Sequence, residues 1–172
     1  TIFGTGTNLQ NLPQEFKGFL TPDEGYTFVE FDKRQAEWVV VAYLTGDANM
    51  LSVVESGRDA HIHTAALMLE ASAGIPYGEG WEIISYDAKI VGMNSDEAVI
   101  KELRESTPIL GRFHPVLPRI MSARQFGKKS NHGLNYDEGP NKFALINELE
   151  QGEGTRAVTL YHRVYPGIHI WY

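Results

Sequence analysis

The sequence contains no cysteine among its 172 residues. A chain without cysteine has no disulfide framework, no thiolate metal ligand and no cysteine nucleophile, which is in keeping with a reducing compartment. It also has no low-complexity tract, no internal repeat and no apolar run near the roughly 20 residues of a membrane span. Because 42% of the residues are hydrophobic, the chain can bury a core. These features predict a soluble, cytoplasmic protein of one domain, or one domain and a part of another.

Acidic residues are absent from residues 106–136, although the whole chain has a formal net charge of −7. The basic residues of this window are Arg112, Arg119, Arg124, Lys128 and Lys129. The window therefore carries +5, and the rest of the chain carries −12. Such segregation indicates an anion-binding site inside an acidic protein, with a solvated basic surface as the alternative. The acidic remainder argues against indiscriminate coating of nucleic acid.

Hydrophobic periodicity predicts a helix-rich α+β fold with one strand pair or a small sheet. The short aromatic and β-branched run 27–32 is typical of a strand and ends at Asp32. Helices are expected at 35–44, 47–56, 59–72, 95–106, 118–136, 141–151 and 154–165.

Residues with capping properties mark several of these helix boundaries. We expect Gly46 to stop the first helix, Asp59 to lie at the start of the third, and Ser95 to cap the fourth. Pro118 is predicted as the first residue of the fifth. Residues 73–116 are rich in Gly and Pro, and apart from 95–106 they are predicted to form an insertion or a large mobile loop.

Four residues spaced by four form one stripe along the predicted helix 118–136: Arg124, Lys128, His132 and Tyr136. A guanidinium and an ammonium one turn apart can grip a polyphosphate, the first as a fork and the second as a point charge. The two rings offer flat faces for a base or a sugar. Gly127 and Gly133 disfavour a helix interior, so a ligand or another backbone is expected to approach closely there.

Carboxylates and histidines mark two further candidate sites. Asp32 at a strand end, with Glu37 one turn into the next helix, is suited either to Mg²⁺ or to capping that helix. His61 and His63 suggest zinc by their spacing, but on a helix rings two residues apart point about 200° from each other. One of them is therefore expected to face the site and the other to lie at the surface.

The motifs and their order resemble the polymerase domain of family A DNA polymerases, the DNA polymerase I type, and most of all its phage versions. The stretches that carry the resemblance are TGTNLQNLP (5–13), FDKRQAEWVVVAYLTGD (31–47), GRDAHIHTA (57–65) and RQFGKKSNHGLNY (124–136). The resemblance implies a helix-rich α+β fold in which a small antiparallel palm sheet element packs with fingers helices. It divides the chain into a partial palm at 1–72, an insertion or mobile loop at 73–116, and fingers helices at 117–172.

The resemblance also implies a role for each matching residue. Asp32 corresponds to a catalytic, metal-binding aspartate, Glu37 to the steric gate against a ribose 2′-hydroxyl, and Gln35 to its polar neighbour. The positions that hold the incoming dNTP, with Gln35 and Glu37, are His61, Arg124, Lys128 and His132. Lys128 and Tyr136 count among the catalytic positions, and the primer-template DNA contacts are Asn8, Gln10, Asn11 and Tyr136.

Some features depart from the family pattern. His132 stands where the family usually has Phe or Tyr, and Asp137 where bacterial members have Gly. The His-Asp-Glu motif with the second catalytic aspartate does not occur in this chain. We therefore expect an incomplete polymerase domain, inactive alone, whose second aspartate comes from the rest of a polymerase or from a complementing chain.

The implied function is template-directed DNA synthesis from dNTPs with two Mg²⁺ ions, in the host cytoplasm if the source is a phage and without a membrane partner. The first alternative is a non-catalytic nucleotide- or nucleic-acid-binding module derived from a polymerase. The second is a metal-dependent hydrolase that uses His61 and His63.

Overall fold

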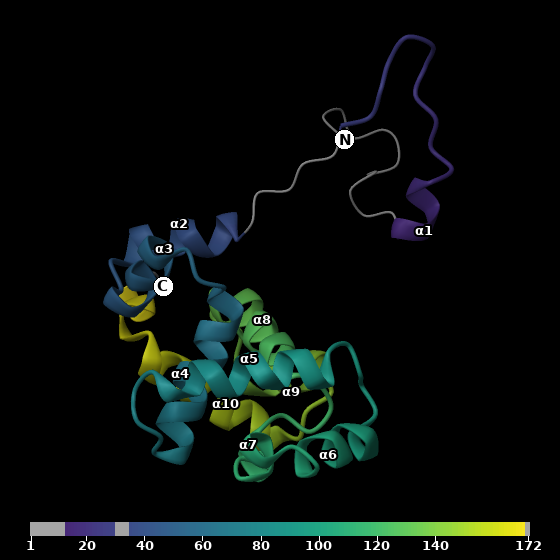
Figure 1. Cartoon of the computed structure of the whole chain (residues 1–172). Helices are drawn as coiled ribbons and strands as arrows, with labels where there is room; N and C mark the ends of the chain where they lie inside the picture. Colours follow the sequence, from purple (N-terminus) through teal and green to yellow (C-terminus); the bar gives the residue numbers. More distant parts are fainter. Residues whose placement is uncertain (1–12, 30–34, 171–172) are drawn as a thin grey trace. The chain divides into compact units, whose positions relative to one another are not determined.

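The structure is a computed structural model that describes residues 13–29 and 35–170. It divides into two units: unit 1 comprises residues 1–34 and unit 2 comprises residues 35–172. The helices of both units are labelled in Figure 1.

Unit 1 contains one short helix among its described residues, α1 (Gln14–Lys17), which begins after Pro13. Of the predicted strand 27–32, residues 27–29 have no regular structure and 30–32 lie outside the described residues. The part of the chain that the structure describes contains no strand, so the predicted α+β fold with a small palm sheet is wrong. A strand needs a partner to satisfy its backbone, and side-chain propensity alone does not supply one.

Every regular element among the described residues of unit 2 is a helix. Its elements are α2 (Ala36–Thr45), α3 (Ala48–Ser56), α4 (Ala60–Ala73), α5 (Glu79–Val91), α6 (Glu97–Glu105), α7 (Pro108–Gly111), η2 (His114–Val116), α8 (Ala123–Leu134), α9 (Pro140–Ile146), α10 (Gln151–Val164) and η3 (Pro166–Ile170). Among the described residues no helix is both long and apolar enough to cross a bilayer.

Helix α4 is the central element of unit 2, in contact with α5, α8 and α10 (Figure 1). Its sequence is apolar on nearly all sides, which is typical of a helix buried all round. One face joins a core with α2, α3, α9 and α10, where Tyr161, Tyr165 and Phe143 are fully buried. The other face joins a second core with α5, α7 and the start of α8, around Leu69, Ile84 and Leu110.

Local capping signals located some helix ends correctly and others wrongly. Asp59 caps α4 through its carboxylate, which accepts from the backbone N–H groups of the second and third helical residues, and Gly46 ends α2 in the left-handed region. The N-cap of α6 is Asp96 and not Ser95. Pro118 does not start a helix, because α8 begins only after Ser122.

Residues 73–116 contain more helix than the sequence indicated. The helix predicted at 95–106 is confirmed by α6, but the expectation that it is the only helix of this segment is wrong, since α5 and the short α7 also form there. Helix α5 buries Ile83 and Ile84 against α4, so packing with a distant segment stabilises what composition alone did not reveal. Whether this segment is an insertion relative to other proteins stays a prediction.

The crossing of α8 over α4 depends on Gly127. A Cβ atom at this position would collide with the carbonyl oxygen of His61 and lie 3.2 Å from the Cβ of Ala65. The close approach expected at Gly127 is therefore that of another helix backbone. This contact sets the separation of α4 and α8 along the part of α8 that carries Arg124 and Lys128.

Replacing Gly127 with alanine should destabilise unit 2 by about 1–3 kcal/mol, because the backbone of α4 cannot give way as a flexible side chain would. Gly152→Ala is the matched control, since that glycine also lies in a helix and has open space around its Cβ direction. Urea denaturation measures both. A Gly127→Ala variant as stable as the control would contradict the close packing.

Candidate anion-binding site

Three of the four stripe residues lie on one side of α8, namely Arg124, Lys128 and His132. Tyr136 does not continue the helix, because α8 ends at Leu134 and Asn135 caps it. Tyr136 is 60% exposed just beyond that end. The predicted helix 118–136 is thus too long at both ends, and the stripe is helical over three residues only.

Arg124 is held by a carboxylate from α4. Its Nη2 lies 2.8 Å from Oδ2 of Asp59, whose other oxygen caps α4 by accepting from His61 and Ile62 backbone N–H groups. Burial would raise the pKa of Asp59, but the hydrogen bond from Arg124 and the capping interactions outweigh it, so the pKa is lowered. Asp59 therefore stays ionised at neutral pH and fixes the first cation of the stripe.

His61 projects from the first turn of α4 toward the stripe. Its ring stacks on that of His132, with ring centroids 6.2 Å apart and an interplanar angle of 30°. Burial lowers the pKa of His61 to about 4; Asp59 opposes that shift, while Arg124 and other nearby cations add to it. His61 is therefore neutral at pH 7 and acts as a hydrogen-bonding group rather than as a third positive charge.

A buried chain of hydrogen bonds fixes the tautomer of His61. Burial raises the pKa of Tyr165, so its hydroxyl keeps its proton and can donate to the oxygen of Thr64, 2.8 Å away. The Thr64 hydroxyl then donates to the amide oxygen of Asn131 (2.9 Å), and the Asn131 NH₂ lies 3.1 Å from Nδ1 of His61. Since Nδ1 accepts from Asn131, the proton resides on Nε2. His61 thus presents an N–H donor beside the cations of α8.

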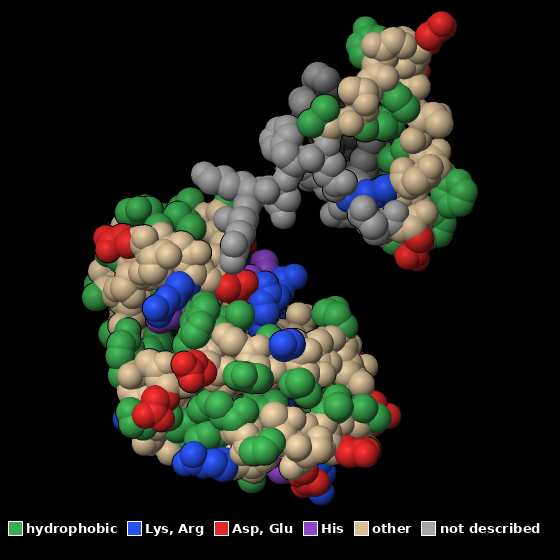
Figure 2. Space-filling view, in the orientation of Figure 1, with side chains coloured by type: hydrophobic (Ala, Val, Ile, Leu, Met, Phe, Trp, Pro, Cys, Tyr) green, Lys and Arg blue, Asp and Glu red, His purple; other side chains and the backbone are tan. Residues whose placement is uncertain are grey.

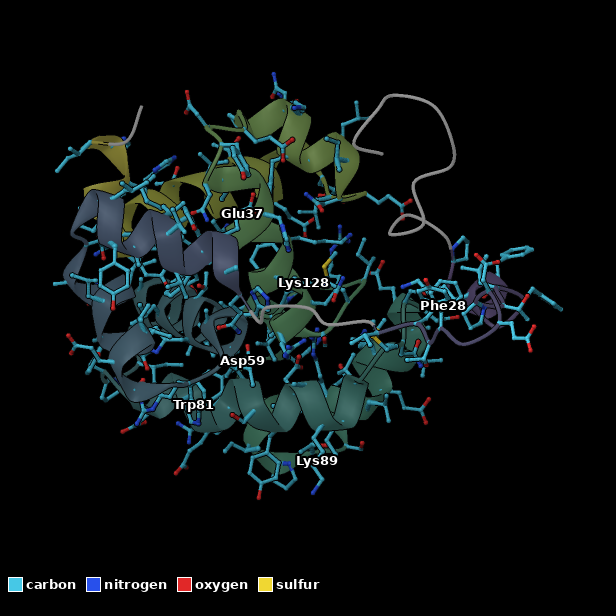
Figure 3. All side chains as sticks on the ribbon, turned by 90° about the horizontal axis from the view of Figure 1, so that it is seen from above. Phe28, Glu37, Asp59, Trp81, Lys89 and Lys128 are labelled. Carbon is cyan, nitrogen blue, oxygen red and sulfur yellow. The ribbon has the colours of Figure 1, made fainter. Side chains whose placement is uncertain are left out.

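Glu37 and Gln35 border the same region from the start of α2. The carboxylate of Glu37 is 3.8 Å from Nδ1 of His132. Gln35 has a left-handed backbone (φ 55°), and its side-chain oxygen accepts from the N–H of Ala60 at 3.4 Å. Figure 3 shows Glu37, Asp59 and Lys128 around one region of unit 2, whereas Lys89 lies at its outer edge.

We name the set formed by His61, Arg124, Lys128 and His132 the cationic face. Figure 2 shows Lys and Arg side chains gathered beside a His and an acidic side chain on unit 2. The cationic face combines a guanidinium, an ammonium and an N–H donor on two packed helices. This arrangement can bind an anion that carries several oxygens.

His63 lies away from the cationic face. It is only 7% exposed and packs beside Trp81 of α5, with ring centroids 6.5 Å apart. The two histidines thus point apart as predicted, but the expectation that the second would lie at the surface is wrong. The reason is α5, which covers that side of α4.

The remaining predicted site residues lie outside the described residues: Asn8, Gln10, Asn11 and Asp32. Within 13–29 and 35–170, no group of three or more His, Asp or Glu side chains could hold a metal ion. The predicted magnesium site at Asp32 therefore stays a prediction.

Sequence reasoning missed several residues that shape the site. Asp59 was expected only to lie near the start of the third helix, and its pairing with Arg124, 65 residues away, has no local signal. Asn131 and Thr64 were not singled out, although an asparagine inside the basic helix is a polar residue that requires a partner when buried. Asp137, where the resemblance implied a glycine, has a φ of 55°. Glycine suits that left-handed backbone best, and aspartate is among the residues that tolerate it.

Comparison with known proteins defines the class to which the chain is related, that of DNA polymerases. It is 38% identical over 71 residues to a thermostable DNA polymerase I of Thermus thermophilus, which is 38% of this chain and 8% of that protein. The thermostable DNA polymerase I of Thermus aquaticus is 37% identical over 75 residues, 40% of this chain and 8% of that protein. For the DNA polymerase I of Aquifex aeolicus the identity is 36% over 62 residues, 36% of this chain and 11% of that protein.

No family model and no solved structure matches the chain. The resemblance inferred from the motifs is confirmed: the chain is a relative of the family A DNA polymerases, of the DNA polymerase I type. It matches only 8–11% of the length of the relatives named above.

NMR of the imidazole nitrogens should find His61 as the Nε2–H tautomer with a pKa of about 4. Asp59→Asn keeps a capping oxygen but removes the charge that opposes the shift, so it should lower this pKa further. A pKa near the ordinary 6.5, or a proton on Nδ1, would contradict the described environment.

The same shift predicts how stability depends on pH. Because the folded pKa lies below the unfolded value of about 6.5, the unfolded chain takes up the proton first as the pH falls. The contribution of His61 is present above pH 6.5 and is lost as the pH falls toward 4. Urea denaturation measures the free energy of unfolding at pH 7 and at pH 5. The loss of this free energy between the two pH values should be smaller for His61→Gln than for the wild type, and an equal loss would exclude this role.

Proposed function

We propose that this chain is part of a DNA polymerase domain and that the cationic face binds the triphosphate of an incoming dNTP. The observation that carries the proposal is the convergence of Arg124, Lys128 and the Nε2–H of His61 on two helices packed at Gly127. The relationship to DNA polymerase I supports it independently.

Each of the three groups would make a different contact with the triphosphate. The guanidinium of Arg124 is already oriented by Asp59, and its fork suits two phosphate oxygens. The exposed Lys128 offers a mobile point charge one turn further along α8. His61, being neutral, would donate a hydrogen bond without adding charge that Asp59 would have to balance.

The other predicted residues receive their roles under the same proposal. Glu37, beside His132, would exclude a ribose 2′-hydroxyl, and Gln35 would hold the start of α2 against α4. The ring of His132 would lie against the nucleotide. Tyr136, exposed beyond α8, would contact template DNA together with the amides Asn8, Gln10 and Asn11.

Phosphoryl transfer depends on positioning and on charge neutralisation, which is what this chain's cations would provide. A divalent metal, expected to be Mg²⁺ at Asp32, would supply further neutralisation when bound. The chain would act with the rest of a polymerase, or with a complementing chain that provides the second aspartate, on primer-template DNA in the cytoplasm.

Lys128→Ala should weaken the binding of dATP to this chain by about 10- to 100-fold, which is the usual effect of losing a hydrogen bond to a charged group. Lys129→Ala is the matched control, because it removes the same charge from the next position of the same helix, about 100° around its axis. Isothermal titration calorimetry measures the dissociation constant of dATP for both variants. Equal loss in the two variants would mean that only net charge matters and would contradict a specific triphosphate site.

Primer extension separates synthesis from binding alone. In a complete polymerase domain that contains this chain, Asp32→Ala should abolish extension, and Glu37→Ala should admit ribonucleotides. A binding module derived from a polymerase would bind dATP and primer-template DNA but give no extension even with a complementing chain. Wild-type turnover in Asp32→Ala would refute the metal role.

A further inference from the structure

A fully buried ion pair joins α5 to α6 and lies within residues 79–105. Nε of Arg104 is 2.6 Å from Oδ1 of Asp87, and its Nη2 is 3.1 Å from Oδ2. The two side chains are 1% and 0% exposed. Withdrawing both charges from water is unfavourable, and well-packed apolar side chains often stabilise a protein as much. The pair therefore calls for an explanation other than stability.

Both partners also bond to the segment that leads into α8. Oδ2 of Asp87 accepts from the N–H of Ala123, the first residue of that helix, at 2.5 Å. Arg104 donates to the carbonyl oxygen of Met121 at 3.1 Å and also to that of Pro118. A carboxylate at a helix N-terminus also interacts favourably with the helix dipole. The pair thus anchors the loop 118–121 and the first turn of α8.

The anchored turn carries the first cation of the cationic face. Arg124 follows Ala123 directly, and its guanidinium must reach Asp59 on α4. Gly127 fixes the separation of α8 from α4 one turn later, but that contact does not fix where the helix begins. The bonds from Asp87 and Arg104 supply this second restraint. The loop's other connections, from Arg119 to Glu97, Glu150 and Glu153, are exposed and are expected to contribute little.

We propose that Asp87 and Arg104 are positioning residues for Arg124, so that the segment 79–105 sets the geometry of phosphate binding without touching phosphate. This inference rests on the proposed function, because it takes Arg124 to be a residue that binds phosphate. It adds residues that the polymerase motifs do not contain. It also gives the helices between α4 and α8 a part in the site.

The test uses the double variant Asp87→Leu/Arg104→Met, whose apolar pair removes both buried charges together and is expected to leave the chain folded. Inorganic tripolyphosphate is the probe. We expect its affinity to fall about tenfold, since a small misplacement of one binding group is sufficient for such a loss. Arg119→Gln is the control, since it cuts the exposed connections of the same loop, and it should change the affinity less than twofold.

Two further readouts distinguish positioning from a general structural role. In an Arg124→Ala background the double variant should cause no additional loss of affinity, because its effect passes through Arg124. An equal loss in that background, or no loss in the wild-type background, would overturn the proposal. Arg104→Lys keeps the charge but not the fork of the guanidinium, so this variant should not retain the wild-type affinity for tripolyphosphate.

The last readout needs no ligand. The NMR signal of the Arg124 Nε–H should shift in the double variant as the pair with Asp59 loosens. If the wild type does not bind tripolyphosphate, the proposed function fails, and this signal then decides the positioning role alone. An unchanged Arg124 signal would overturn it, and so would failure of the double variant to fold, since the pair would then be required for the fold itself.

Discussion

The packing of α8 on α4 at Gly127 is the contact on which the site depends. Because a glycine allows the two backbones to approach, His61 on one helix comes to lie beside the cations of the other. Every further feature of the cationic face presupposes this approach: the ion pair between Asp59 and Arg124, the stack of His61 on His132, and the reach of Asn131 to the His61 ring.

Carboxylates from other helices organise the basic helix in this acidic chain. Asp59 serves α4 as a cap and α8 as a counter-ion, so one side chain couples the start of one helix to the first cation of the other. Asp87, fully buried with Arg104, accepts from the backbone N–H of Ala123 in the first turn of α8. The window 106–136 lacks acidic residues, and the structure provides them from elsewhere. Arg119 and Arg124 thus form ion pairs with carboxylates from outside the window.

The sequence predicted most helices, because their signals are local. Asp59 and Gly46 cap and stop helices through contacts within a few residues, and the structure confirms both. The strand predicted at 27–32 does not form at 27–29, the part of it that the structure describes, because a strand needs a partner. Helix α5 was missed because it gains its stability from burying Ile83 and Ile84 against α4. The candidate site was predicted as far as its residue types. The geometry of the site could not be predicted, since the partners of Arg124 and His61 are 65 to 70 residues away in the sequence.

The most direct test of the account is a backbone and side-chain NMR map of this chain titrated with dATP in the absence of metal. We predict that the largest shifts fall on the Arg124 Nε–H, the Lys128 side chain and the imidazole of His61, with His63 unaffected. Shifts that avoid these groups, or that gather at the exposed Arg119 instead, would contradict the assignment of the cationic face as the triphosphate site.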